Sequence, residues 1–188
     1  MYPGRGPYFT SGQWHGFFWI AHHGAGTTVT ATSFMHTSFE PPLCIRGSVV
    51  PTPDNTSNAM LGVNLNQPDT QDMTVQTIAP SADGLLLDVK NNAGSALRVQ
   101  IQALDGAVND QARWCAPVSG SGGFIPWTAF NTACWDNSGA PYRLQPISGA
   151  MLLVPGSPSE SVTYDVCLNA LSEASAPAAA ESGASGAP

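Results

Sequence analysis

The clearest pattern of apolar and polar positions lies between residues 97 and 102, where the two kinds of residue alternate strictly. Alternation with a period of two predicts a β-strand with one buried face and one solvated face. The apolar face carries Leu97, Val99 and Ile101, and the polar face carries Arg98, Gln100 and Gln102. Long hydrogen-bonding side chains in a row fit either a plain solvated sheet face or a surface that binds a flat polar ligand.

Other segments of the chain show related patterns. Residues 59–65 alternate as well, which buries Leu61, Val63 and Leu65 and turns Asn64 outward. Residues 13–23 are aromatic on both faces, as in a strand that is covered on both sides. No helical period persists for three turns, and short strand-like segments recur between turn-forming residues. The sequence therefore predicts an all-β fold, a β-sandwich or jelly roll.

Composition separates one domain from a C-terminal segment. Residues 172–188 consist of Ala, Ser, Gly and Pro with two Glu, and such a segment buries too little apolar surface to offset its ordering entropy. We therefore expect a domain over residues 1–171 and a disordered tail or linker over residues 172–188. The chain holds 19 Gly and 16 Pro, and only 10% of its residues are charged, which is typical of a loop-rich extracellular β-domain.

Net charge restricts the class of ligand. The chain carries −7 with six Lys and Arg in total, whereas nucleic-acid binding needs a basic stripe. Nucleic acid is therefore excluded as a partner, an anionic polysaccharide is disfavoured, and a neutral glycan is compatible. The sequence contains no apolar run of about 18 residues, so it predicts no membrane-spanning segment. The N-terminal residues do not form a signal peptide, which indicates a segment of a longer protein.

Four cysteines occur without metal-ligand spacing. Pairing Cys115 with Cys134 would close a loop of about 20 residues and contribute roughly 3 kcal/mol in the chain-entropy model. Cys44 and Cys167 would then join an early strand to the last one. Four free buried thiols are the alternative. The composition favours the two disulfides and an oxidising compartment, so we expect a secreted protein.

The search for catalytic groups finds little. Of the four histidines, His22 and His23 are adjacent and would point to opposite faces of a strand, so they cannot share a metal from one face. No two carboxylates stand in a context typical of glycoside hydrolysis, because most lie in turns. Motifs of serine hydrolases, zinc proteases and phosphate loops are absent from the sequence. We therefore expect no enzymatic activity, with a small glycan-active enzyme as the less favoured alternative.

A family resemblance is carried by the order and spacing of several segments. They include an Arg-Val-x-Ile strand at Arg98, a Pro-Trp-x-x-Phe turn at Pro126, and a last strand that contains Asp165. Over residues 14–171 the chain resembles the galactose-binding-domain-like β-sandwich modules of secreted bacterial polysaccharide-degrading proteins, and it is similar to complex I intermediate-associated protein-like domains. The segments compared are 59–66, 84–89, 97–101, 124–130 and 162–168.

The resemblance implies two antiparallel sheets and a groove that binds a neutral plant-type polysaccharide, such as a β-glucan or xyloglucan-like chain. Aromatic rings would stack on sugar faces, and Arg and amide side chains would bond the hydroxyl groups. The implied ligand-binding residues are Asn64, Arg98, Gln100 and Gln102 on the sheet, Trp114, Trp135 and Tyr142 in loops, and Trp19. Trp127 is expected in the core, and Trp14 fits either the core or the binding surface.

The resemblance also implies a structural calcium, with Asp165 at one ligand position. The first-strand ligands of that family are missing from residues 2–6, so no cofactor is required by the sequence. The implied partners are the polysaccharide and a catalytic domain in the parent protein, and we expect a monomer. The alternative function is an extracellular structural or adhesion domain that does not turn over glycans.

Overall fold

The structure of the protein is a computed structural model that describes residues 7–31, 42–69 and 74–178. This part of the chain forms strands and two short 3₁₀ helices, and none of its helices is long and apolar enough to cross a membrane. The elements in chain order are β1 (Tyr8–Ser11), β2 (Trp14–His23), β3 (Thr28–Ala31), β4 (Leu43–Val49), β5 (Asn58–Asn64), β6 (Gly84–Asn91), β7 (Leu97–Gln102), η1 (Asp110–Ala112), β8 (Arg113–Val118), β9 (Gly122–Pro126), η2 (Trp127–Ala129), β10 (Gly149–Pro155) and β11 (Val162–Ala174).

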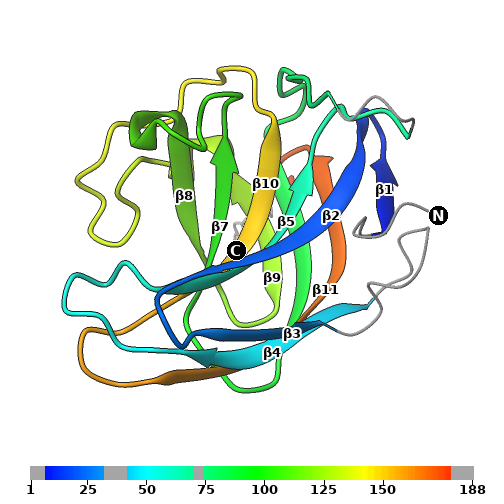
Figure 1. Ribbon diagram of the computed structural model, residues 1–188. Helices are drawn as coiled ribbons and strands as arrows, with labels where there is room; N and C mark the ends of the chain where they lie inside the picture. The colour runs from blue at the N-terminus through cyan, green and yellow to red at the C-terminus, as the bar shows by residue number, and fades with distance from the viewer. Residues whose placement is uncertain (1–6, 32–41, 70–73, 179–188) are drawn as a thin grey trace, which may run out of the picture.

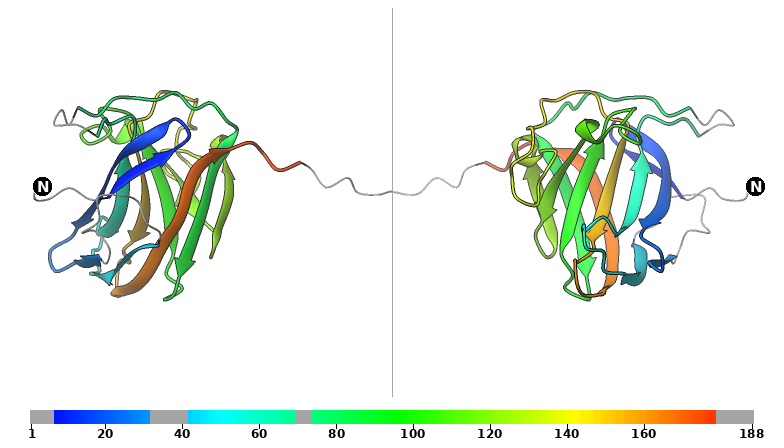
Figure 2. Two further views of the ribbon diagram at one scale, coloured as in Figure 1. Left: turned by 90° about the vertical axis from the view of Figure 1, so that its right-hand side faces the viewer. Right: turned by 60° about the vertical axis from the view of Figure 1, so that its left-hand side comes forward.

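The strands form two antiparallel sheets. One has six strands in the order β1-β2-β5-β10-β7-β8, and Figure 1 shows these strands side by side. The other has five strands in the order β3-β4-β11-β6-β9, and Figure 2 shows the two sheets as layers. The all-β sandwich of two antiparallel sheets is therefore confirmed.

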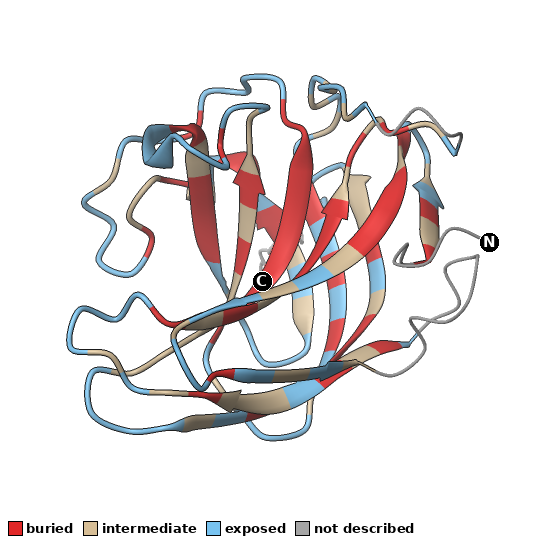
Figure 3. Cartoon of the chain, viewed as in Figure 1, coloured by how far each residue is buried: buried red, intermediate tan, exposed pale blue. Residues whose placement is uncertain are grey.

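The hydrophobic core lies between the two sheets. The apolar positions of β5 and β7 are almost completely buried there, as the alternation predicted. Trp14 and Trp127 also lie in the core, where the indole N–H of Trp127 donates to the carbonyl of Ala82 at 2.8 Å. β10 is buried from Gly149 to Val154, at inward and outward positions alike, as Figure 3 shows.

The disulfide between Cys44 and Cys167 joins β4 to β11. The two residues stand directly opposite each other in the strand register, with their Cα atoms 4.0 Å apart. The bond links positions separated by 123 residues along the chain. The predicted pairing is present, and it closes a loop that contains most of the domain.

The last strand extends beyond the domain boundary expected from composition. Ser172, Glu173 and Ala174 pair with β6, three residues past Leu171. The carboxylate of Glu173 accepts hydrogen bonds from the backbone and hydroxyl of Ser81, both at 2.9 Å. Backbone pairing does not need large side chains, so a segment of small residues can still complete a strand. Residues 179–188 of the predicted tail lie outside the described residues.

Alkaline pH is expected to destabilise the domain through Tyr164, which is 1% exposed and donates to the carbonyl of Thr28 at 2.8 Å. Burial raises the pKa of Tyr164 from 10.0 to about 12. The protonated phenol is therefore favoured by folding, and its contribution is complete below pH 10 and lost as pH rises towards 12. Burial raises the pKa of Tyr142 as well, with the same sign.

Urea unfolding at about pH 9 and about pH 11 tests this expectation. The free energy of unfolding should fall between the two pH values, and it should fall less in Tyr164→Phe. An equal fall in the wild type and in Tyr164→Phe would contradict the assignment to Tyr164.

Candidate functional site

The outer face of the six-stranded sheet carries outward side chains that the register aligns in rows. Opposite residues of antiparallel strands point to the same side of a sheet, so a row can be followed from strand to strand. One row consists of Trp19, Gly62, Met151, Gln100 and Cys115. The adjacent row consists of Ala21, Met60, Leu153, Arg98 and Pro117. Residues from five neighbouring strands, β2, β5, β10, β7 and β8, therefore share one surface.

A pocket of about 420 Å³ opens on this outer face. It lies over β5, β10, β7 and β8, between the loop that precedes β5 and the loop that contains Trp135. Its lining residues are His23, Asn55, Thr56, Ser57, Asn58, Met60, Arg98, Gln100, Arg113, Cys115, Trp135, Leu153 and Pro155. The predicted residues Arg98, Gln100 and Trp135 are among them.

The floor of the pocket is apolar and its rim is polar. Met60 and Leu153 face outward from adjacent strands in the same row. The amide of Gln100 lies 3.3 Å from the sulfur of Met151, which fixes the Gln100 side chain across β10. A ligand over this floor would contact apolar surface below and amide or guanidinium groups at its edges.

One wall of the pocket is the loop that carries Trp135, which is 62% exposed. The disulfide between Cys115 and Cys134 attaches this loop to β8, as predicted. Asn131 pairs with Cys115 through two backbone hydrogen bonds of 2.8 and 3.1 Å. The guanidinium carbon of Arg98 lies 5.7 Å from the Trp135 ring centroid, within the range of a cation–π interaction.

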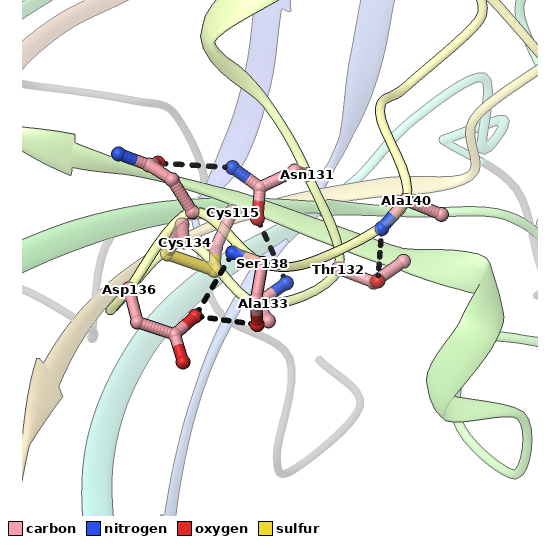
Figure 4. The surroundings of a disulfide bond; sticks show 9 residues. Cys115, Asn131, Thr132, Ala133, Cys134, Asp136, Ser138 and Ala140 are labelled. Carbon is pink, nitrogen blue, oxygen red and sulfur yellow. Dashed lines mark hydrogen bonds between the residues drawn. A yellow bond between two sulfur atoms is a disulfide. The ribbon is translucent and has the colours of Figure 1, made fainter.

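Side-chain hydrogen bonds within this loop fix its shape, as Figure 4 shows. The Asn131 side chain accepts from the backbone N–H of Ala133 at 2.9 Å. The Asp136 carboxylate accepts from the backbone and hydroxyl of Ser138, which lowers its pKa. Such Asx-turns restrict a loop without regular secondary structure. Trp135 therefore stands between two fixed points, Cys134 and Asp136.

The opposite wall is the loop that contains Asn55, Thr56 and Ser57. The hydroxyl of Ser57 donates to the carbonyl of Val50 at 2.5 Å, and the side chain is 1% exposed. Gly156 passes so close that a Cβ atom there would lie 2.1 Å from the Ser57 hydroxyl oxygen. This close approach needs a glycine and holds the loop against the end of β10.

A second aromatic and amide pair lies on the same outer face, beside the pocket. The Trp19 indole covers Gly62, where a Cβ atom would lie 2.3 Å from the ring, and its N–H donates to the Asn64 side chain at 3.0 Å. Asn64 donates in turn to the Gln67 side chain at 3.0 Å. Trp19 and Gln100 share a row across three strand spacings, or about 14 Å.

Two predicted binding residues are in the core instead. Trp114 was expected in a loop but belongs to β8, directly opposite the core residue Ile101, so its side chain points inward. Trp114 and Tyr142 are 5% and 6% exposed, and their ring centroids lie 5.0 Å apart. Neither ring can wall a surface groove in this conformation. Gln102 faces outward opposite Arg113 but does not line the pocket.

The predicted calcium ligand Asp165 lies on β11, in the strand pairing with β4. The register places Arg46, a cation, opposite it. No group of three or more His, Cys, Asp or Glu in the described part of the chain is arranged to hold a metal ion. Calcium can also take backbone and amide oxygens as ligands, so the structural calcium at Asp165 stays a prediction.

Several lining residues were not predicted from the sequence. Asn58 and Met60 have the same parity as Asn64, so extending the alternation of β5 backwards would have placed them on the outer face. Leu153 lies in an uninterrupted apolar strand, whose two faces cannot be told apart by periodicity. His23 and residues 55–57 reach the pocket through tertiary packing, and no local signal marks them.

Comparisons with known proteins bear on the fold. No protein family model and no curated protein matches the chain by sequence. Among solved structures, the chain resembles the family 11 carbohydrate-binding module of a cellulosomal cellulase of Clostridium thermocellum, with a TM-score of 0.55 and 11% identity. The alignment covers 86% of this chain and 91% of that module. The chain therefore has a β-sandwich fold like that of this carbohydrate-binding module.

A second solved structure has a lower similarity. The Endo-D glycoside hydrolase domain of Streptococcus pneumoniae R6 aligns with 82% of this chain and 21% of its own, at 12% identity and a TM-score of 0.42. A TM-score this low does not show that the two chains share a fold. The narrower galactose-binding-domain-like assignment remains a prediction.

Proposed function

We propose that the chain is a non-catalytic module that binds a polysaccharide through the outer face of its six-stranded sheet. The observation that carries this proposal is the pocket, which combines an apolar floor with the exposed ring of Trp135 and the side chains of Gln100 and Arg98. The fold shared with a carbohydrate-binding module is consistent with it.

The chemistry of the pocket suits a sugar ring. A pyranose has apolar C–H faces and a polar edge of hydroxyl groups, so it needs a flat apolar contact and hydrogen-bonding groups beside it. Trp135 provides an aromatic face, and Gln100 provides an amide that can both donate and accept. Trp19 and Asn64 offer a second contact on the same face, which a chain of several sugars could reach.

Binding is favoured over hydrolysis because of the residues that line the pocket. Glycoside hydrolysis typically uses two carboxylates that flank the scissile bond. The lining residues are apolar, amide, hydroxyl and basic, and the pocket as described holds no Asp or Glu. The proposed role is therefore to concentrate a polymer near another domain rather than to cleave it.

The resemblance stated above suggests the wider setting. It favours a galactose-binding-domain-like module in a secreted protein, acting as a monomer, with a β-glucan or xyloglucan-like chain as ligand and a catalytic domain as partner. The two disulfides support an oxidising compartment. We propose that the Ala-, Ser-, Gly- and Pro-rich C-terminal segment connects the module to that partner.

Trp135→Ala is expected to weaken polysaccharide binding roughly threefold to tenfold, because it removes an exposed aromatic contact. Trp19→Ala should have a smaller effect, since its ring lies beside the pocket. Affinity gel electrophoresis against xyloglucan, mixed-linkage β-glucan, glucomannan, xylan and pectin measures both. The matched control is Leu86→Ala, which removes an exposed apolar side chain from the five-stranded sheet.

Three outcomes would overturn the proposal. Retention that is unchanged in Trp135→Ala and Trp19→Ala would move the binding site away from this face. No retention by any polymer would favour a structural or adhesion domain instead. Release of reducing ends during incubation would show that the chain is an enzyme.

A further inference from the structure

The pocket has a local charge opposite to that of the whole chain. The chain carries −7, and it has six Lys and Arg in total. Two of these six, Arg98 and Arg113, line the pocket together with His23, and no Asp or Glu appears among the lining residues that the structure describes. Charges farther apart than about 8 Å are largely screened at physiological ionic strength, so the local charge governs a bound ligand.

The side chains of Arg98 and Arg113 differ in their partners within the protein. Arg113 donates to the carbonyls of Gly106 and Ala107 and forms an ion pair with Asp110 at 3.2 Å. The Arg98 side chain makes no hydrogen bond and no ion pair to any residue within the described ranges, and its guanidinium lies over the Trp135 ring. Arg113 is therefore occupied by its own loop, whereas the donors of Arg98 are available to a ligand.

The position of Arg98 makes an unpaired guanidinium costly. The side chain is half-buried on β7, and burial lowers its pKa. A guanidinium has five N–H donors and remains charged, so partial burial without an acceptor is unfavourable. Its planar fork matches a carboxylate through two parallel hydrogen bonds, which a single hydroxyl group cannot reproduce.

We propose that the pocket binds an acidic sugar, namely a hexuronic acid whose carboxylate accepts from the Arg98 guanidinium while its ring lies against Trp135. This inference rests on the proposed function and specifies its ligand. The rest of the chain bound to the protein is neutral, because the remaining outer face towards Trp19 offers Gln100 and Asn64 rather than further free cations. The ligand is thus a polysaccharide that combines neutral and uronic acid residues.

The inference replaces the expectation, drawn from net charge, of a neutral ligand alone. Net charge sums all groups, and none of the acidic residues that the structure describes is among the pocket-lining residues. Electrostatic attraction between a ligand and a site depends mainly on the charges within about 8 Å of the ligand. A chain with a net negative charge can therefore hold an anionic sugar at one point.

The test uses pairs of polymers that differ in one functional group. Glucuronoxylan, polygalacturonate and alginate are each compared with a carboxyl-reduced counterpart of equal length, in which the carboxylate has become a primary alcohol. Dissociation constants are measured for the wild type and for Arg98→Gln, Arg98→Lys and the control Arg46→Gln. Arg46 is an exposed arginine on the five-stranded sheet, so its substitution changes the net charge equally.

We expect the wild type to bind at least one acidic polymer tenfold or more tightly than its reduced counterpart. Arg98→Gln should abolish that difference, Arg98→Lys should keep part of it, and Arg46→Gln should leave it intact. Rising salt should weaken binding of the acidic polymer and spare the reduced one. The thermal unfolding midpoint of Arg98→Gln should not fall below that of the wild type, since the Arg98 guanidinium is partly buried and has no acceptor among the described residues.

The failures are distinguishable. Equal binding of native and reduced polymers, or equal weakening of both by Arg98→Gln, would overturn the acidic-sugar inference and leave polysaccharide binding in place. A preference for the acidic polymer that persists in Arg98→Gln would also overturn it. No binding of any polymer, neutral or acidic, would remove the proposed function and this inference together.

Discussion

Replacement of Cys44 and Cys167 together by alanine is expected to lower the free energy of unfolding by about 4–5 kcal/mol. The bond joins positions 123 residues apart, and the chain-entropy model gives about 4.7 kcal/mol for a loop of roughly 100 residues. Domains of this size have a free energy of unfolding of about 5–15 kcal/mol, so the loss is a large fraction of the total. Urea unfolding under non-reducing conditions measures it.

The control for this variant is the wild type unfolded in the presence of a reductant, which should show a loss at least as large because both disulfides open. β4 and β11 pair over seven register positions in either case. A decrease below about 1 kcal/mol would contradict the chain-entropy value for this loop and show that the disulfide constrains the unfolded chain little.

The second large effect is expected from replacement of Cys115 and Cys134 by alanine. The sequence separation of 19 residues corresponds to about 3 kcal/mol in the same model. This variant also releases the Trp135 loop from β8, so polysaccharide binding should weaken at least as much as in Trp135→Ala. Urea unfolding and affinity gel electrophoresis of one preparation measure the two effects.

The two cysteine variants serve as controls for each other. The Cys44 and Cys167 variant loses more stability but leaves the walls of the pocket intact, so its polysaccharide binding should equal that of the wild type while it remains folded. If the Cys115 and Cys134 variant binds normally, the hydrogen bonds of Asn131 are sufficient to position Trp135.

Periodicity predicts much of the sheet in which the pocket lies. In β7 the alternation separates the buried apolar face from Arg98, Gln100 and Gln102, and the same holds for Asn64 in β5. Periodicity does not predict β8, because its sequence Arg-Trp-Cys-Ala-Pro-Val shows no alternation of apolar and polar residues and contains a proline. The sequence therefore predicts a loop at Trp114, and only its pairing with Ile101 shows that Trp114 faces the core.

The pocket itself could not be predicted in the same way. Its floor depends on the order β5-β10-β7, which places segments far apart in the sequence side by side. Its walls depend on how residues 55–57 and Trp135 close over that floor. Strand order and loop packing are non-local, whereas parity is read within a single strand. The local charge of the pocket follows from the same packing, so net charge alone could not reveal it.

The Cys44–Cys167 bond also determines how the module would respond to mechanical tension between its two ends. A covalent bond carries the load, so pulling could extend only the residues before Cys44 and after Cys167. The pocket strands β5, β7, β8 and β10 lie within the closed loop and would be shielded from the force. Trp19 lies outside the closed loop, on β2. A stretched module would therefore lose the proposed ligand contact of Trp19 first and retain those of Arg98 and Trp135.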